Sequence, residues 1–276
     1  MLTVKAPAKI NLTLEVLGKR PDGYHEIRSV VQAVDLCDTL HFSEARGISF
    51  TCDLPGWSAE KSLVSKAAEL LRGGKGAAVT IEKRIPLLSG LGGDSSDAAA
   101  VLRGLNDLWR LALSDEKLLA LAAQLGSDVP FFIRGGTALA SGRGEIIEPL
   151  PSLPETRVVL VVPDIPVEPG KTARMYSALK PAHFTDGSMT QKLVNELKRG
   201  KPIDSASLVN VFEDVAADVH PGLSYYISGC IRSGVPVHLA GSGPALFAIR
   251  HDMSYAAEFR KTVEEHHARA YIVETL

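Results

Sequence analysis

The sequence lacks the features that mark most specialised classes of protein. Its three cysteines (Cys37, Cys52 and Cys230) are odd in number, far apart and include no Cys-x-x-Cys pair, so neither a disulfide framework nor a zinc site is indicated. No run of about 18 apolar residues occurs, so no membrane-spanning helix is expected. The formal net charge is only −2, which gives no general attraction for nucleic acid or an anionic membrane.

The first residues also lack the continuous apolar stretch of a signal peptide, because residues 1–16 alternate between apolar and polar side chains. We therefore predict a cytoplasmic protein. Hydrophobic residues make up 45% and charged residues 22% of the chain, which is ordinary globular usage and excludes general disorder. A length of 276 residues favours one large or two moderate domains.

Hydrophobic periodicity predicts an α/β chain of the α+β kind. Strands are expected at 2–17, 29–42, 77–84, 157–162, 235–240, 245–249 and 270–274, and helices at 59–71, 95–109, 114–125, 171–179, 190–198, 221–233 and 254–267. The first two strands are expected to pair antiparallel. The proline-rich segment 148–157 is the best linker, so we predict domains at 1–153 and 154–276.

A glycine-rich loop precedes the helix expected at 95–109. The segment from Pro86 reads PLLSGLGGDSSDAAAVL, with small residues followed by two hydroxyls and then an alanine-rich helix. The first N–H groups of a helix are unpaired and carry the positive end of its dipole, so this segment predicts a phosphate site. It comprises Leu88, Ser89, Gly90, Leu91, Gly92, Gly93, Asp94, Ser95 and Ser96. The alternative is a plain turn in which Ser95 or Ser96 caps the helix.

Two familiar phosphate motifs do not fit. Gly90-x-Gly92 begins like a dinucleotide-binding fingerprint, but position 95 is serine and a second helix follows instead of a strand. Gly170-Lys171-Thr172 ends like a P-loop, but Ile165 stands where that motif needs glycine. The phosphate loop is therefore of another kind.

Three segments together resemble the galactokinase, homoserine kinase, mevalonate kinase and phosphomevalonate kinase superfamily. They are PAKINL from Pro7, PLLSGLGGDSSDAA from Pro86 and AGSGPALFA from Ala240, and they follow the family order. RPDGYHEI from Arg20 and GSDVPFF from Gly126 resemble the branch that phosphorylates the 2-hydroxyl of a cytidine-diphosphate derivative of methylerythritol, in the non-mevalonate route to isoprenoid precursors.

The resemblance implies a two-domain fold with ATP and this small-molecule substrate in the cleft between the domains. It also implies a catalytic pair, in which Asp128 accepts or orients the hydroxyl proton and Lys9 offsets the developing negative charge. Without the motifs, Asp128 would be a helix cap or turn residue and Lys9 a solvated strand lysine.

Further residues are carried over as substrate contacts. Asn11 would bind the polyol hydroxyls, and its side chain shares a strand face with Lys9. Tyr24 would stack on cytosine, His25 would read its edge, and Tyr176 would be a second aromatic for the base. The remaining predicted substrate residues are Thr172, Gly241 and Gly243, with the two glycines letting their loop approach the phosphate loop. The bland alternatives are strand-edge solvation for Asn11 and surface packing for Tyr24 and His25.

Two acidic residues in the phosphate loop need an explanation. Asp94 and Asp97 would repel bound phosphates unless they point away or a cation intervenes. Mg²⁺ is expected with ATP, but no carboxylate cluster identifies its ligands, and the sequence defines no oligomeric state. The competing hypotheses are a homoserine or mevalonate-pathway kinase, a non-catalytic nucleotide or sugar sensor, and a nucleic-acid module, the last disfavoured by the charge.

Overall fold

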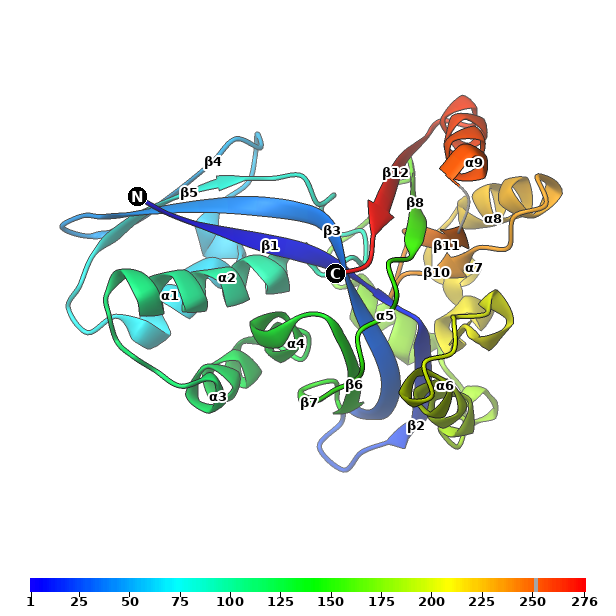
Figure 1. The fold of residues 1–276 in the computed structure, drawn as a ribbon, viewed down its shortest axis with the longest axis horizontal. Helices are drawn as coiled ribbons and strands as arrows, with labels where there is room; N and C mark the ends of the chain where they lie inside the picture. Colours follow the sequence, from blue (N-terminus) through cyan, green and yellow to red (C-terminus); the bar gives the residue numbers. More distant parts are fainter. Residues whose placement is uncertain (251–252) are drawn as a thin grey trace. The chain divides into compact units, whose positions relative to one another are not determined.

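A computed structural model describes residues 1–250 and 253–276 (Figure 1). The α+β class predicted from the sequence is confirmed, since the described residues form two β-sheets with α-helices packed on them. Among these residues, no helix has the length and apolarity needed to cross a membrane.

The larger sheet contains β1 (Leu2–Asn11), β2 (Thr13–Lys19), β3 (His25–Glu44), β4 (Ile48–Cys52), β5 (Ala77–Glu82), β6 (Thr137–Gly142), β7 (Ile146–Pro149) and β9 (Val209–Asn210). The second sheet has the order β10 (His238–Leu239), β11 (Leu246–Arg250), β8 (Arg157–Pro163) and β12 (Ala268–Glu274). The α-helices are α1 (Leu63–Leu71), α2 (Gly93–Leu108), α3 (Asp115–Leu125), α4 (Val129–Arg134), α5 (Lys171–Ala178), α6 (Ser188–Lys198), α7 (Ala216–Val219), α8 (Leu223–Arg232) and α9 (Met253–Glu265).

The chain forms two compact units, and each unit is built from several separate segments of the sequence. Unit 1 comprises 1–8, 36–87 and 92–135, and unit 2 comprises 9–35, 88–91 and 136–276. The long strand β3 contributes its first part to unit 2 and its second part to unit 1. The domain boundary predicted near residue 153 stays a prediction, because the two compact units are each built from several segments and are not separated at one position.

In unit 1, helices α1 and α2 run along one face of the strands (Figure 1). The C-terminal part of β3 pairs antiparallel with β5, and β5 pairs parallel with β4. Helix α2 comes so close to β3 that a β-carbon at Gly104 would lie 2.5 Å from the Phe42 ring. Glycine is therefore required at this packing position.

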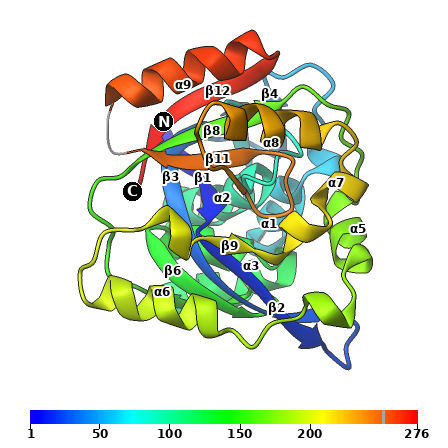
Figure 2. The ribbon, with the colours of Figure 1, turned by 90° about the vertical axis from the view of Figure 1, so that its right-hand side faces the viewer.

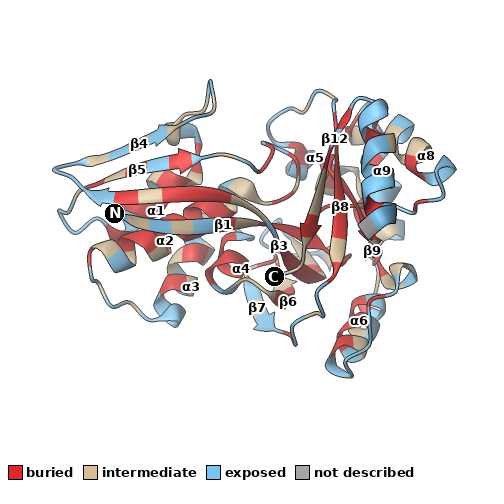
Figure 3. Ribbon diagram, turned by 45° about the horizontal axis from the view of Figure 1, so that its top comes forward, coloured by how far each residue is buried: buried red, intermediate tan, exposed pale blue. Residues whose placement is uncertain are grey.

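Unit 2 has its core around the second sheet. Its central strand β8 is almost wholly buried and pairs antiparallel with β11 and β12, as Figures 2 and 3 show. Helix α9 packs on β12 and β8. The apolar cluster extends from this sheet to Leu14, Val16 and Ile27 near the start of the chain. Early and late residues thus share one core.

Most predicted elements are confirmed within a few residues, but the first strand is wrong as a single element. The chain bends at Leu12, which separates β1 from β2, and next to the bend the Val30 N–H donates to the Thr13 hydroxyl at 2.9 Å. The antiparallel pairing that follows is confirmed, with Glu15 opposite Arg28. The strand predicted at 235–240 shortens to His238–Leu239.

Candidate active site

The two glycine-rich loops of unit 2 lie in direct contact. Residues 88–91 meet residues 240–243, where a β-carbon on Gly90 would lie 2.3 Å from the Ala240 carbonyl oxygen and 2.9 Å from the Gly243 nitrogen. Gly90 also has φ +94, which other residues rarely adopt. The Ala245 N–H donates to the Ser89 carbonyl at 2.9 Å, which ties the loops together. Gly90 is thus required twice over, by conformation and by space.

The phosphate loop continues into helix α2, which begins at Gly93. The capping position is Gly92, in a left-handed conformation with φ 77, so no side chain caps the helix. The alternative in which Ser95 or Ser96 caps α2 is therefore wrong, because both lie inside its first turn. The Ser96 hydroxyl is fully buried and has no hydrogen-bond partner among the described residues, so it can still bind a ligand.

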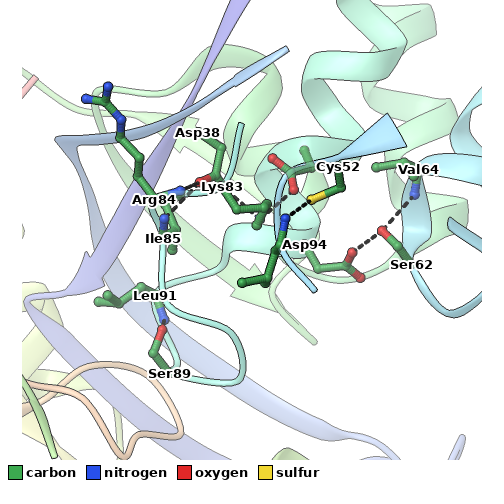
Figure 4. Close-up of polar contacts among 12 residues, drawn as sticks. Asp38, Cys52, Ser62, Val64, Lys83, Arg84, Ile85, Ser89, Leu91 and Asp94 are labelled. Carbon is green, nitrogen blue, oxygen red and sulfur yellow. Dashed lines mark hydrogen bonds and ion pairs between the residues drawn. The ribbon is translucent and has the colours of Figure 1, made fainter. Parts of the chain in front are cut away.

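The carboxylates of Asp94 and Asp97 are both engaged within unit 1, and Figure 4 shows Asp94 directed at Ser62. Asp94 accepts hydrogen bonds from the Ser62 hydroxyl and from the Leu63 N–H, at the start of α1. Asp97 accepts from Lys83 Nζ at 2.6 Å. Both carboxylates are thereby bonded to protein donors of unit 1, and Asp97 has the Lys83 ammonium as a cationic partner.

Lys83 also reaches a second buried carboxylate. Its Nζ lies 2.5 Å from Asp38 Oδ2, and Asp38 Oδ1 accepts from the N–H groups of Arg84 and Ile85 at 2.5 and 2.8 Å. All three side chains of the triad Asp38–Lys83–Asp97 are at most 3% exposed. Two carboxylates against one ammonium leave a net negative charge in a dry site.

Burial raises the pKa of the Asp97 carboxyl to about 7, against the attraction of Lys83, and Asp38 raises it further. Burial alone lowers the pKa of Lys83, but Asp97 and Asp38 outweigh that effect and raise it. Lys83 therefore stays charged, and Asp97 is the group whose charge changes near neutral pH.

Lys9 is buried in unit 2, only 4% exposed, so the alternative of a solvated strand lysine is wrong. Its Nζ donates to Asn11 Oδ1 at 2.7 Å. A β-carbon at Gly241 would lie 2.7 Å from the same Nζ, so this glycine lets its loop close over the lysine. Asn11 is 6% exposed, which also rules out strand-edge solvation.

Asp128 belongs to unit 1 and occupies the capping position of α4 without making a capping hydrogen bond. The plain helix-cap reading of this residue is therefore not supported. The apolar run after it, predicted only as a segment, is helix α4. The pairing of Asp128 with Lys9 stays a prediction.

The predicted cytosine residues gather in unit 2. His25 stacks on Tyr176, with ring centroids 4.9 Å apart and planes inclined by 16°. Phe184, which the sequence analysis did not single out, meets His25 edge-on at 5.9 Å. Burial and the nearby Lys19 lower the pKa of His25, so at neutral pH its imidazole offers one donor and one acceptor. Tyr24 is 51% exposed, with the Arg143 guanidinium 5.0 Å from its ring centroid.

Thr172 and the residue before it attach α5 to the second glycine loop. The Thr172 hydroxyl lies 2.9 Å from Ser242 Oγ, and Lys171 Nζ donates to Ser242 Oγ at 2.7 Å and to the Gly243 carbonyl. Gly170-Lys171-Thr172 does not match the P-loop motif, and the hydrogen bonds of Lys171 and Thr172 to protein groups agree with this. Lys171 and Ser242 lie in quoted segments but were not predicted as contacts, and Phe184 lies in no motif.

The described residues contain no cluster of three or more acidic, histidine or cysteine side chains that could hold a metal. Mg²⁺ in kinases needs few protein ligands, because phosphate oxygens and water supply the rest. The unpartnered hydroxyl of Ser96 fits such a minimal role.

Comparison with known proteins identifies the family to which this chain is similar. Residues 62–136 match the family model for the GHMP kinases N terminal domain. A 4-diphosphocytidyl-2-C-methyl-D-erythritol kinase from Dehalococcoides mccartyi is 47% identical over 281 residues, covering 100% of this chain and 99% of the relative. One from Pelotomaculum thermopropionicum is 43% identical, covering 96% of each chain.

Solved structures of kinases share the fold of this chain. A crystal structure of 4-(cytidine 5'-diphospho)-2C-methyl-D-erythritol kinase has a TM-score of 0.83 and 32% identity, covering 99% of both chains. A homoserine kinase from Cytophaga hutchinsonii reaches a TM-score of 0.73 at 18% identity, covering 99% of this chain and 94% of that one, which shows a shared fold only. The predicted superfamily fold and the small-molecule kinase class are confirmed, and the chain belongs to the family of 4-diphosphocytidyl-2-C-methyl-D-erythritol kinases.

Proposed function

We propose that this protein transfers the γ-phosphoryl group of ATP to the 2-hydroxyl of 4-diphosphocytidyl-2-C-methyl-D-erythritol. The observation that carries the substrate choice is the aromatic cluster of His25, Tyr176 and Phe184, in the same unit as Lys9 and Asn11. A neutral imidazole beside aromatic faces suits a nucleobase. Homoserine and mevalonate have no base that would use such a cluster.

ATP is bound by its phosphates. The backbone N–H groups of the loop and the first turn of α2 would hold the phosphate oxygens, since Gly90 and Gly92 keep the backbone free of side chains there. Mg²⁺ accompanying ATP would offset phosphate charge, with Ser96 Oγ as the protein group that would hold it.

The transfer step needs three further groups. Asn11 binds and orients the polyol, and Asp128 accepts the proton of the 2-hydroxyl as its oxygen attacks the γ-phosphorus. The bond from that phosphorus to the β–γ bridging oxygen breaks, and ADP leaves. The Lys9 ammonium offsets the negative charge on the transferred group. Lys9 is suited to this because its Nζ is oriented by the hydrogen bond to Asn11 Oδ1.

The test is a substrate panel with purified protein, Mg²⁺ and ATP. The cytidine compound, free methylerythritol, homoserine and mevalonate are each offered, and ADP release and product mass are recorded. We expect turnover of the cytidine compound to exceed that of the others by orders of magnitude, because an unfilled base site leaves polar groups unpaired. Faster turnover of homoserine or mevalonate would refute the proposed substrate, and no turnover of any alcohol would favour a non-catalytic sensor.

Two variants separate substrate recognition from catalysis. His25→Ala should raise KM for the cytidine compound while slow ATP hydrolysis by water continues. Asp128→Asn should lower kcat by far more than tenfold and leave both KM values nearly unchanged, because the amide keeps the size of the side chain but accepts no proton. A rate within about tenfold of the parent, below ~1.4 kcal/mol of barrier, would remove Asp128 from the mechanism.

A further inference from the structure

A chain of buried hydrogen bonds runs through unit 2 at the bend between β1 and β2. Lys9 Nζ donates to Asn11 Oδ1 at 2.7 Å, and Asn11 Nδ2 donates to Ser29 Oγ at 2.8 Å. Ser29 Oγ then donates to the Thr13 carbonyl oxygen at 2.5 Å. The four residues are at most 6% exposed, so the chain is shielded from water.

Each bond in this chain has only one possible direction. The Thr13 carbonyl can only accept, so the single hydroxyl proton of Ser29 is committed to it. Ser29 Oγ must then accept from Asn11, which requires the NH₂ end of that amide to face the serine. At the other end, the Lys9 ammonium can only donate, so it needs the Oδ1 end. The carbonyl of Thr13 therefore fixes which way the Asn11 amide points.

The opposite amide orientation would be costly. It would place NH₂ against the Lys9 ammonium, donor facing donor, and would turn Asn11 Oδ1 toward a hydroxyl with no proton to offer. Lys9 has little room to avoid this, because a β-carbon at Gly241 would lie 2.7 Å from its Nζ. In a site shielded from water, the loss of both hydrogen bonds of the Asn11 amide is costly.

We propose that Ser29 is a positioning residue for phosphoryl transfer, which keeps Asn11 Oδ1 directed at Lys9 and thereby holds the ammonium where charge develops. This inference rests on the proposed function, in which Lys9 and Asn11 serve the reaction. Ser29 acts through Asn11. Its removal leaves Asn11 Nδ2 without an acceptor and frees the amide to turn.

A double-mutant cycle tests this coupling. Parent, Ser29→Ala, Asn11→Ala and the double variant are compared in kcat and in KM for ATP. Ser29→Ala should lower kcat by roughly 10- to 100-fold in the parent, as small misplacements at a reacting centre do. KM for ATP should change by no more than about twofold. In the Asn11→Ala background the same substitution should change kcat by no more than about twofold.

A matched control removes another buried hydroxyl of unit 2. Thr137 donates to Gln32 Oε1 at 2.6 Å from the neighbouring strand β6, so Thr137→Val loses a buried bond without touching Lys9 or Asn11. It should leave kcat unchanged. If Ser29→Ala does not fold, Ser29→Cys keeps the side-chain size with a weak acceptor and runs through the same cycle. Equal factors for the Ser29 substitution in both backgrounds would overturn the proposal.

A second readout does not need activity. The side-chain amide signals of Asn11, identified in ¹⁵N-labelled protein by their loss in Asn11→Ala, should shift and exchange faster in Ser29→Ala. Unchanged signals would overturn the proposal even if the parent phosphorylates no alcohol. If the parent prefers another alcohol, the proposed substrate fails, but the cycle is run with that alcohol and still decides the role of Ser29.

Discussion

Replacing Asp97 by asparagine should make the free energy of unfolding less dependent on pH. The Asp97 carboxyl shares the buried Lys83 ammonium with Asp38, and burial raises its pKa from 3.8 to about 7. A carboxyl whose pKa is higher in the folded than in the unfolded state binds an extra proton on folding. The contribution of this carboxyl to the free energy of unfolding is therefore fully present below about pH 4 and is lost as the pH rises through 7. The asparagine side chain does not titrate, so Asp97→Asn should not lose this stability as the pH rises.

The size of the effect follows from the same shift. Each pKa unit corresponds to 1.36 kcal/mol, so the parent should lose up to about 1.4 kcal/mol per pH unit relative to Asp97→Asn. Across the interval from 3.8 to about 7, the parent can lose at most about 4 kcal/mol of unfolding free energy relative to Asp97→Asn. This is a ceiling, because Lys83 and Asp38 share the change in charge with Asp97. That is a large fraction of the usual 5–15 kcal/mol of total stability.

The assay is urea unfolding of both proteins at pH 5, 6, 7 and 8. Trp57 and Trp109 both lie in unit 1 with the triad, so their fluorescence reports on the unit concerned. Asp107→Asn is the control, since it removes an exposed carboxylate from the same helix and should give no comparable trend. A difference in unfolding free energy between parent and Asp97→Asn that stays constant with pH would refute the assignment of this proton to Asp97.

Three further predictions concern two glycines and a histidine. Gly90→Ala should destabilise the protein by at least about 1 kcal/mol and reduce turnover, because φ is +94 and the methyl group would meet the Ala240 carbonyl; an unchanged midpoint in urea would contradict this. Gly229→Ala, inside α8 with open space around it, should instead stabilise by about 0.5–1 kcal/mol in the same assay. Since burial and Lys19 lower the pKa of His25, KM for the cytidine compound should be flat near neutral pH and rise only at pH values below the ordinary histidine pKa of 6.5, as protonation removes the acceptor nitrogen. A KM independent of pH would exclude His25 from base recognition.

The sequence was most informative where local pattern determines structure. The helix after the phosphate loop was predicted at 95–109 and lies at Gly93–Leu108, because its alanine-rich run has a clear helical character. The short helix Val129–Arg134 was not predicted, since six mostly apolar residues do not complete two turns and give no period. The predicted strand 29–42 is in fact His25–Glu44, whose first residues pair with β2 and β6 and whose last residues pair with β5.

The site was predictable only where motifs mark it. The glycine loops and the residues Lys9, Asn11 and His25 lie in recognisable segments. Asp38 and Lys83, by contrast, are 45 residues apart and meet only through the tertiary fold. Ser29 gives no signal in the sequence, because its importance depends on the direction of one hydroxyl proton.

The interleaved division of the chain sets an order for folding during synthesis. Unit 1 consists of residues up to 135, so all of it has been made once that point is translated. The segment 9–35 belongs to unit 2 and needs partners from the last strand, since the Glu274 N–H bonds to Asp35 across 239 residues. At 5–20 residues per second, this early segment waits roughly 10–50 s for them. During that time β2 and the first part of β3 expose apolar side chains, which makes the nascent chain a natural client for chaperones.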